Sequence, residues 1–367
     1  MYNIKKIQLK ELLDFSKSEQ FLRLQNKPIS SLRISSYLNN PLAKQDDLVL
    51  YMAFDDEKLV GYRTIWRDRF FLSKKANSFG WLSGSWVHPK YRRKGISTKL
   101  FEEVYKDWEG NLMFTNYAIN AKLLFDKTRQ FSNIKSLQGT RYYSRFCLSE
   151  ILERKHKIFS YLKFIFLFFD IIFNYLVDLN FLFFKKKVLK SEVRKDEVLN
   201  PEIDSFLKDF KEKEFFKRDK NTYEWIKNFP WINKGKDLKK ESQQYYFSLF
   251  AKDFQSNYYT FYNSKKELVA FVWLSLRDGH LKIPYVYFKK NSIDDIVNFI
   301  LAIIKEEKIK TILVYQKEIE EVLNSKRFFI TKKTFYQNFF ATINLELNSN
   351  NIEKMKIQSG NGDVIFT

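Results

Sequence analysis

A short basic segment, residues 87–97 (VHPKYRRKGIS), combines the residue types that bind phosphate groups. An apolar stretch ends at its first residue, Pro89 stops that stretch, and Gly95 precedes residues with helical spacing. The first turn of a helix has unpaired backbone N–H groups and a partial positive charge, and a glycine lets a phosphate approach the backbone closely. Arg92, Arg93 and Lys94 add cationic donors at the same place. We therefore expect this segment to bind a diphosphate.

The spacing of this segment differs from that of two common phosphate-binding loops. The GxxxxGK[ST] pattern of P-loop proteins is absent. The dinucleotide fingerprint requires three glycines, and two of them are missing. The sequence therefore points to a different kind of diphosphate site.

The order Arg92-Arg93-Lys94-Gly95-Ile96-Ser97 resembles the signature of the GNAT superfamily of acyl-CoA N-acyltransferases, Gln/Arg-x-x-Gly-x-Gly/Ala after a V-x-P-x-Y-R lead-in. Ser97 stands where the family usually has Gly or Ala. The resemblance implies that the loop holds the pyrophosphate of acyl-CoA and that the backbone of the preceding strand pairs with the pantetheine arm. It implies the following cofactor-binding residues: Trp86, Val87, Arg92, Arg93, Lys94, Gly95, Ile96, Ser97, Thr98 and Asn120.

The family's usual acid and base are missing from their expected places. Phe125 stands where many members have the Tyr that protonates the departing thiolate, and the strand over residues 78–87 has no Glu to act as base. Three explanations stay open. Positioning alone can accelerate the attack of a neutral amine; a tyrosine, Tyr117, Tyr142 or Tyr143, can supply a proton; or the C-terminal carboxylate can act as base, as in some tandem GNAT proteins. The candidate catalytic residues are Tyr142, Tyr143 and Thr367. The alternatives are that the two tyrosines only pack against other side chains and that Thr367 belongs to a frayed terminus.

The elements around the basic segment indicate a mixed α/β domain. We expect a strand hairpin over residues 46–54 and 59–71, a strand over 78–87 and a helix over 95–108 with apolar residues at helical spacing. A short strand over 112–115 and a second helix opening at Asn120 follow. This order is the one that the GNAT resemblance implies.

The length of 367 residues favours more than one domain. Residues 201–367 repeat the element order of the first part without its basic glycine loop, and they resemble the degenerate second half of tandem GNAT proteins. We therefore predict an α/β fold with mixed sheets and two GNAT-like domains, an acyl-CoA-binding domain at 1–150 and a second at 201–367. Residues 151–200 are the expected helical linker; we also expect a helical connector over 190–220 and a closing hairpin over 328–347.

Residues 158–184 are almost wholly apolar and are long enough to cross a bilayer as one helix. On a helical period, however, Lys163, Asp170, Asn174 and Asp178 fall on one narrow stripe. A lipid-facing span would carry these charges at a cost of about 3 kcal/mol each. We therefore expect an amphipathic helix, either an in-plane anchor at a membrane surface or a helix buried against protein.

Composition limits the partners. The net charge is +21, but the lysines are spread along the whole chain, so we do not expect nucleic acid as a partner. The single Cys147 excludes an intramolecular disulfide, and with three His the sequence offers no metal-ligand cluster. The N-terminal residues lack a secretory signal, so we expect a cytoplasmic protein, peripheral on the inner face of a membrane if residues 158–184 meet lipid.

These observations predict an acyl-CoA-dependent N-acyltransferase with acetyl-CoA as donor and a small-molecule or sugar amine as acceptor. Two alternatives stay open: a catalytically inactive GNAT scaffold that binds at a membrane surface, and a transferase that uses aminoacyl-tRNA. The acceptor, the acyl chain and the oligomeric state do not follow from the sequence.

Overall fold

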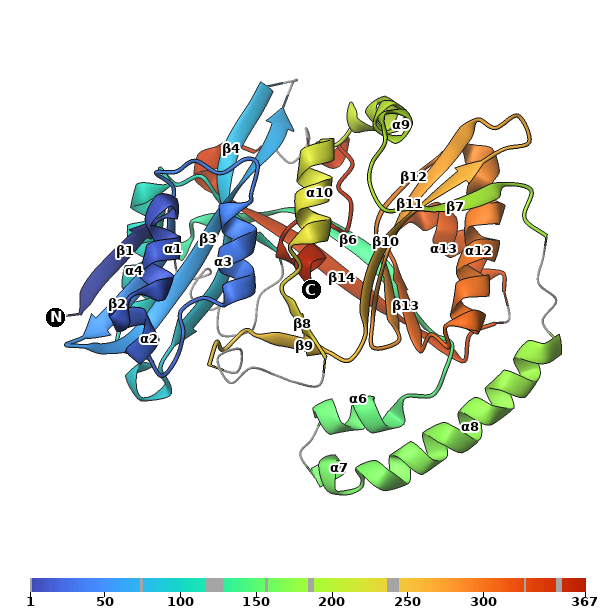
Figure 1. The fold of residues 1–367 in the computed structure, drawn as a ribbon, viewed down its shortest axis with the longest axis horizontal. Coiled ribbons are helices and arrows are strands. Elements are labelled where there is room, and N and C mark those ends of the chain that lie inside the picture. The colour runs from blue at the N-terminus through green and yellow to red at the C-terminus, as the bar shows by residue number, and fades with distance from the viewer. Residues whose placement is uncertain are drawn as a thin grey trace. The chain divides into compact units, whose positions relative to one another are not determined.

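The computed structural model describes residues 2–72, 75–115, 128–155, 158–183, 188–235, 244–326, 328–347 and 352–367. Its contacts divide the chain into two units (Figure 1). Unit 1 comprises Met1–Leu137, Leu199–Lys252 and Gln337–Thr367, and unit 2 comprises Gln138–Val198 and Asp253–Tyr336. The expected boundaries at 150 and 200 follow chain order, whereas the structure returns two later segments to the N-terminal unit.

The N-terminal part of unit 1 alternates helices and strands as expected. The predicted hairpin, the strand before the basic segment, the helix after it and the short strand are all present, with ends within three residues of the expected ones. The elements are β1 (Asn3–Gln8), α1 (Leu9–Lys17), α2 (Glu19–Arg23), α3 (Ser31–Leu38), β2 (Leu48–Asp55), β3 (Lys58–Leu72), β4 (Lys75–Val87), η1 (Pro89–Tyr91), α4 (Ile96–Asp107) and β5 (Leu112–Thr115).

In unit 1, α4 packs against the strands β2, β3 and β4. Strands β1 to β4 pair antiparallel in sequence order, and β4 pairs parallel with β5. Ile96, Leu100 and Val104 on one face of α4 are buried in a core that includes Ile65 of β3. Because β4 and α4 are both fixed by this core, the loop between them has little freedom at either end.

Later segments complete unit 1. They contribute β14 (Thr331–Thr342), whose end pairs antiparallel with β5, so the last long strand of the chain stands next to a strand of the N-terminal part. In Figure 1 the C-terminal residues, in red, lie beside α10, in yellow. The other elements are α9 (Pro201–Lys211), α10 (Lys220–Asn228), β8 (Ile232–Lys234), β9 (Leu249–Ala251), η3 (Ile343–Leu345) and η4 (Asp363–Phe366).

The strands of unit 2 follow one another in the order β6, β13, β12, β11, β10, β7, with β12 and β13 parallel. Two helices, α12 and α13, share its apolar core. The elements are the end of β6 (Phe131–Tyr143), α6 (Leu148–Lys155), α7 (Ile158–Tyr161), α8 (Lys163–Phe183), β7 (Glu192–Asp196), β10 (Phe254–Tyr262), β11 (Leu268–Arg277), β12 (His280–Phe288), η2 (Lys290–Ser292), α12 (Ile293–Glu306), β13 (Thr311–Val314), α13 (Lys317–Asn324) and the start of β14.

Three expectations from the sequence were wrong in detail. The connector over 190–220 is not wholly helical, because residues 192–196 pair with β10 as the edge strand β7. The closing hairpin over 328–347 is the single strand β14, which lies partly in unit 2 and partly in unit 1. The helix over 158–184 is interrupted at Leu162, where α7 ends before α8 begins.

A buried ion pair holds one of the returning segments against the N-terminal sheet. Asp68 of β3 and Arg218 are both almost inaccessible to solvent and form a two-pronged salt bridge. Trp81 Nε1 also donates to Asp68 Oδ2, at 2.6 Å. The desolvation cost of such a pair is offset only while both partners are present.

Replacing Arg218 alone should therefore destabilise unit 1 strongly. We expect Arg218→Met to lower the free energy of unfolding by about 3 to 5 kcal/mol, because the Asp68 carboxylate is left buried and unpaired. The double variant Asp68→Asn, Arg218→Met should recover part of this loss, since no charge is then buried. Urea unfolding followed by tryptophan fluorescence measures both; equal stability of the single and double variants would contradict the assignment.

Candidate active site

The loop between β4 and α4 has the backbone geometry of an anion site. β4 ends at Val87, the turn η1 follows, and Gly95 is the N-cap of α4 with a φ angle of +77°. A side chain at this φ is strained, yet a Cβ atom on Gly95 would meet no atom of the described residues within 4 Å. The backbone conformation at this position therefore favours glycine, and the space around Gly95 is open among the described residues.

Hydrogen-bond donors surround this open space. No side chain of the described residues caps α4, so the backbone N–H groups of its first turn, at Ile96, Ser97 and Thr98, remain for a ligand. Immediately before them, the side chains of residues 92–94 are exposed. The structure therefore brings residues 92–98 together on one turn, as the sequence indicated, and a diphosphate is the ligand that suits this set of donors.

One edge of β4 is open next to this loop. Within the described residues, β4 pairs with β5 only at Gly80 and Trp81, whereas on its other side it pairs with β3 as far as Val87. An extended ligand with amide groups can pair with such an edge as another strand would. The ring of Trp86 is buried and stacked on Tyr62 at 5.4 Å between centroids, so only its backbone is available to a ligand.

A bulge at Gly84 interrupts the β3–β4 ladder beside this edge. The register shifts between Arg63 and Thr64, and Gly84 has a φ angle of +79°. A Cβ atom on Gly84 would lie 2.9 Å from the Tyr245 hydroxyl oxygen and 3.0 Å from Thr64 Oγ1. The bulge therefore brings bare backbone close to polar side chains.

The C-terminal tail places a carboxylate where β4 and β5 separate. Ser83 of β4 donates from Oγ to Asp363 Oδ2 at 3.1 Å, and Thr115 of β5 donates from Oγ1 to Asp363 Oδ1 at 3.1 Å. Ser83 lies just beyond the last β4 residue that pairs with β5, and Thr115 is the last residue of β5. The Asp363 carboxylate thus spans the opening between the two strands.

Arg33 of α3 contributes a buried positive charge to this group. Its guanidinium donates to Ser83 Oγ at 2.8 Å and stacks 3.9 Å from the ring centroid of Trp231. Burial of the carboxyl raises the pKa of Asp363 above its ordinary value, and the neighbouring Arg33 opposes this rise. A carboxylate with a raised pKa is a stronger proton acceptor than an ordinary surface aspartate.

Aromatic packing fixes the tail that carries Asp363. Phe366 stacks on Trp231 with 4.3 Å between centroids and also contacts the rings of Trp66 and Trp225. The Trp231 backbone N–H donates to the Phe366 carbonyl at 2.8 Å. The tail is therefore a packed part of unit 1, and Asp363 has a defined position.

Several buried hydroxyl groups gather near the Gly84 bulge. The Thr64 hydroxyl lies beside those of Tyr37 and Tyr245, and the Tyr62 hydroxyl lies beside the backbone of Tyr246. These hydroxyls place polar atoms next to the bare backbone of the bulge. Burial also raises the pKa of the Tyr245 hydroxyl, which keeps its proton in place at neutral pH.

The catalytic candidates named from the sequence stay predictions. Tyr142 is a core residue of unit 2, where its hydroxyl donates to Asn324 Oδ1 at 3.0 Å. Tyr143 is its neighbour in β6 and pairs with β13. Thr367 donates from its hydroxyl to the Val364 carbonyl, and no observation tests its carboxylate as a base.

Residues 116–127 lie outside the described part of the chain, and with them Asn120, Tyr117 and Phe125. The residues that sequence reasoning missed are Arg33, Tyr245 and Asp363. Asp363 stands inside the tail motif GNGD, four residues before Thr367, whose carboxylate is one of the bases left open by the sequence. For Arg33 and Tyr245 the sequence carries no local signal.

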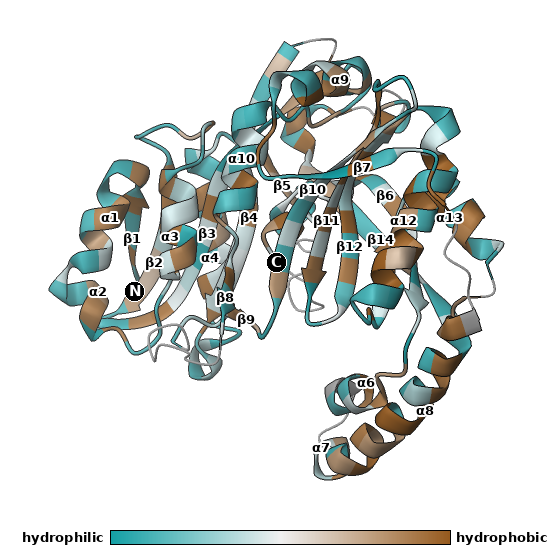
Figure 2. Ribbon diagram, turned by 45° about the vertical axis from the view of Figure 1, so that its right-hand side comes forward, coloured by the Kyte–Doolittle hydropathy of each residue, from teal (hydrophilic) through white to brown (hydrophobic). Residues whose placement is uncertain are grey.

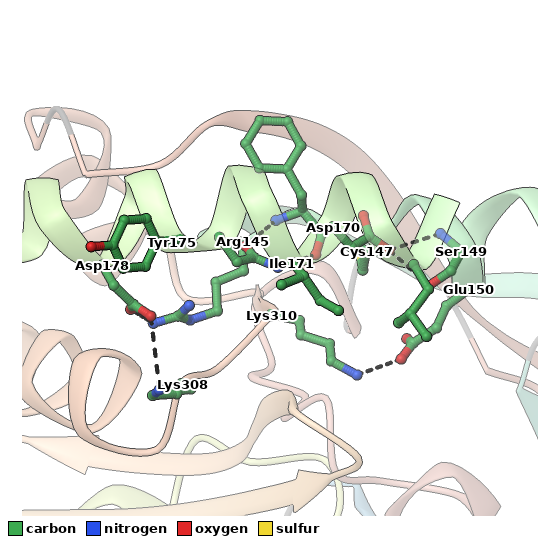
Figure 3. Close-up of a pocket in the computed structure, with 13 residues that line it drawn as sticks. Arg145, Cys147, Ser149, Glu150, Asp170, Ile171, Tyr175, Asp178, Lys308 and Lys310 are labelled. Carbon is green, nitrogen blue, oxygen red and sulfur yellow. Dashed lines mark hydrogen bonds and ion pairs between the residues drawn. The ribbon is translucent and has the colours of Figure 1, made fainter. Parts of the chain in front are cut away.

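A cavity of about 400 Å³ lies in unit 2 between α8 and the loops that it packs on (Figure 3). Its charged groups are paired with one another: Arg145 with Asp178, and Lys310 with Glu150. Hydrogen bonds from His280 and Lys310 lower the pKa of Glu150 to about 2. The ion pairs around this cavity hold α8 in place. Among the described residues, no three His, Cys, Asp or Glu side chains lie close enough together to bind a metal ion.

Comparison with known proteins agrees with the geometry of unit 1. Residues 9–117 match the model of the Acetyltransferase (GNAT) family. No curated protein matches the chain. Among solved structures, a conserved protein of unknown function from Enterococcus faecalis V583, a probable N-acyltransferase, is similar with a TM-score of 0.54 and 10% identity over 95% of this chain and 74% of that one.

A second similar structure is a GCN5-related N-acetyltransferase from Anabaena variabilis ATCC 29413. Its TM-score is 0.52 with 9% identity, over 93% of this chain and 72% of that one. At such identities the likeness shows the fold. The chain therefore contains a GNAT domain and has a GNAT fold overall, and GNAT acetyltransferases take their acyl group from acetyl-CoA or another acyl-CoA.

The anion site at Gly95 is directly testable. We expect Gly95→Glu to raise the Kd for CoA at least about tenfold, a loss of about 1.4 kcal/mol, because a carboxylate enters the phosphate position. Gly235→Glu is the matched control, since Gly235 also has a positive φ and a Cβ atom there would meet no atom of the described residues within 4 Å. Isothermal titration with CoA measures both variants; equal affinities in the two would rule out the loop as the diphosphate site.

Proposed function

We propose that this GNAT-domain protein is an acyl-CoA-dependent N-acyltransferase that moves an acetyl group from the CoA thioester to a primary amine. The observation that carries the proposal is the carboxylate of Asp363, held by Ser83 and Thr115 where β4 and β5 separate. The diphosphate loop opens at the end of the same strand, four residues beyond Ser83. CoA bound along the open edge of β4 would bring its thioester to this carboxylate.

Asp363 acts as the proton acceptor in this reaction. An amine reaches the enzyme mostly as an ammonium ion, which has no lone pair for attack, so one proton must leave before or during C–N bond formation. The raised pKa of Asp363 suits it to take that proton. Arg33 touches the carboxylate group through Ser83 and acts as a positioning residue that keeps Asp363 ionised until then.

Tyr245 stabilises the leaving group as a hydrogen-bond donor. As the amine nitrogen attacks the carbonyl carbon, the C=O electron pair moves to oxygen; when it returns, the C–S bond breaks and its electron pair stays on sulfur as a thiolate. The second proton that the nitrogen loses as the amide forms passes through water to this thiolate and gives the CoA thiol. Burial raises the pKa of the Tyr245 hydroxyl, so it keeps its proton and donates a hydrogen bond to the sulfur. The hydroxyl lies beside the Gly84 bulge.

An inactive scaffold is the second candidate, because the usual GNAT acid and base are missing from their expected places in the sequence. The structure supplies a carboxylate and a phenol in unit 1 from later segments, and this favours the enzyme. The third candidate, aminoacyl-tRNA-dependent transfer, needs no diphosphate loop. The intact loop at residues 92–98 favours acyl-CoA instead.

Asp363→Asn should separate binding from catalysis. We expect kcat with acetyl-CoA and an amine acceptor to fall by about 10² to 10⁴, with the Kd for CoA unchanged within a factor of about two, since Asp363 does not belong to the diphosphate loop. Mass spectrometry of the acylated amines from a panel gives the rate, and titration gives the Kd. An Asp363→Asn rate within threefold of wild type would contradict the role.

The pH dependence tests the same group independently. A base works deprotonated, so the wild-type rate should fall as the pH drops through the pKa of Asp363, and this fall should occur above the ordinary carboxyl range because the pKa is raised. The acidic limb should be absent from the residual rate of Asp363→Asn. An unchanged limb in that variant would assign it to another group.

Tyr245→Phe should lower kcat by about 10² with little change in KM, because it removes only the hydroxyl. Tyr51→Phe is the matched control, since Tyr51 is a buried tyrosine of β2 whose hydroxyl lies beside Asp107 and Trp108. Steady-state assays and thermal unfolding of both variants make the test. Equal rates in the two variants would remove Tyr245 from the mechanism.

A further inference from the structure

The helix α8 of unit 2 exposes an apolar face along its whole length. It runs from Lys163 to Phe183, and Figure 2 shows most of it in the brown of hydrophobic residues. Side chains on this face are largely open to solvent: Phe164 is 70% exposed, Phe168 59%, Ile171 61%, Tyr175 65% and Leu182 72%. An exposed apolar surface of this extent marks a contact site in a folded protein.

The opposite face of α8 is occupied by the protein itself. Asp170 accepts from the backbone N–H groups of Leu148 and Ser149, at 2.7 and 2.9 Å, and from Ser149 Oγ at 2.7 Å. Asn174 exchanges two hydrogen bonds with the backbone of Phe146.

Both ends of the same polar stripe carry ion pairs. Asp178 pairs with Arg145, and Lys163 pairs with Glu153 at 2.8 Å. The polar stripe is thus bonded at four positions along the helix (Figure 3 labels Asp170 and Asp178). These bonds fix the rotation of α8 about its own axis, so that its apolar face points away from the rest of unit 2.

The same bonds argue against a membrane-crossing helix. α8 is long and apolar enough to span a bilayer by length and composition. In a spanning orientation, however, the polar stripe and the α6 residues bonded to it would enter the hydrocarbon together, and charged groups there cost several kcal/mol. A helix that lies parallel to a surface keeps the stripe on protein and buries only its apolar face.

Charge favours a lipid surface over a second copy as the occupant. The chain has a net charge of +21, so two copies repel each other, whereas an anionic bilayer attracts it. In the sequence, lysines stand on both sides of the helix, at 155, 157 and 185–187. Tyr161 and Tyr175 add exposed aromatic rings of the kind that favour the membrane–water interface.

We propose that α8 is an in-plane membrane anchor: its apolar face inserts into the surface of an anionic phospholipid bilayer, while its polar stripe keeps it fixed to unit 2. The anchor is independent of acyl transfer, because it uses none of the groups of unit 1. It would place the enzyme at a cytoplasmic membrane surface, where anionic lipids concentrate.

The test is flotation of the full chain with vesicles of phosphatidylcholine and phosphatidylglycerol. We expect wild type to float with 1:1 vesicles, to float less at 0.5 M NaCl, and to be released by carbonate at pH 11. The variant Phe164→Glu, Phe168→Glu, Leu182→Glu should lose at least about tenfold in bound fraction. These side chains are exposed, so the variant should unfold at the wild-type temperature.

A matched control places one glutamate on an exposed apolar side chain of unit 1, Leu22→Glu, which should float as wild type does. Three results would overturn the proposal. In the first, the triple variant floats as well as wild type. In the second, wild type stays with the vesicles after carbonate treatment. In the third, wild type does not float and is a dimer by light scattering, whereas the triple variant is a monomer. The last result would assign the face to a second copy.

Discussion

The carboxylate of Asp363, hydrogen-bonded to Ser83 on one strand and Thr115 on the other, closes the opening between β4 and β5. Two parallel strands that separate leave unpaired backbone groups, and these attract a polar ligand. In this protein the opening is bounded by a fixed acidic side chain and by a guanidinium that bonds to the same serine. The rest of unit 1 is arranged so that this one group stays in place.

Holding the tail requires the segments that return to unit 1 after residue 198. Phe366 is clamped between aromatic rings from β3 and from residues 225 and 231, and the Asp68–Arg218 pair ties the same returning segment to the sheet. A catalytic group carried by a chain terminus would otherwise fray. The proposed site therefore needs both the N-terminal and the later segments of unit 1, since the proposed base and phenol come from residues after 240.

The local parts of this site follow from the sequence, and the non-local parts do not. The strand, glycine loop and helix around Gly95 are set by near neighbours, so spacing and apolar periodicity predicted them correctly. The polar stripe of α8 could also be predicted from the sequence, because it depends only on the helical spacing of nearby residues. Asp363, Tyr245 and Arg33 meet only through tertiary packing, and a half-buried aspartate in a tail motif has no periodic signal. The pairing of β14 with β5 also could not be predicted, because the two strands are more than 200 residues apart in the sequence.

In the proposed reaction the acyl thioester meets Asp363 where β4 and β5 separate. A crystal structure of the full chain with a non-reactive acetyl-CoA analogue would show whether it does. We expect the diphosphate on the N–H groups of residues 95–98, the pantetheine along the open edge of β4, and the acyl carbonyl beside Gly84 with Asp363 on the acceptor side. A diphosphate bound away from Gly95, or an acyl group remote from Asp363, would contradict it.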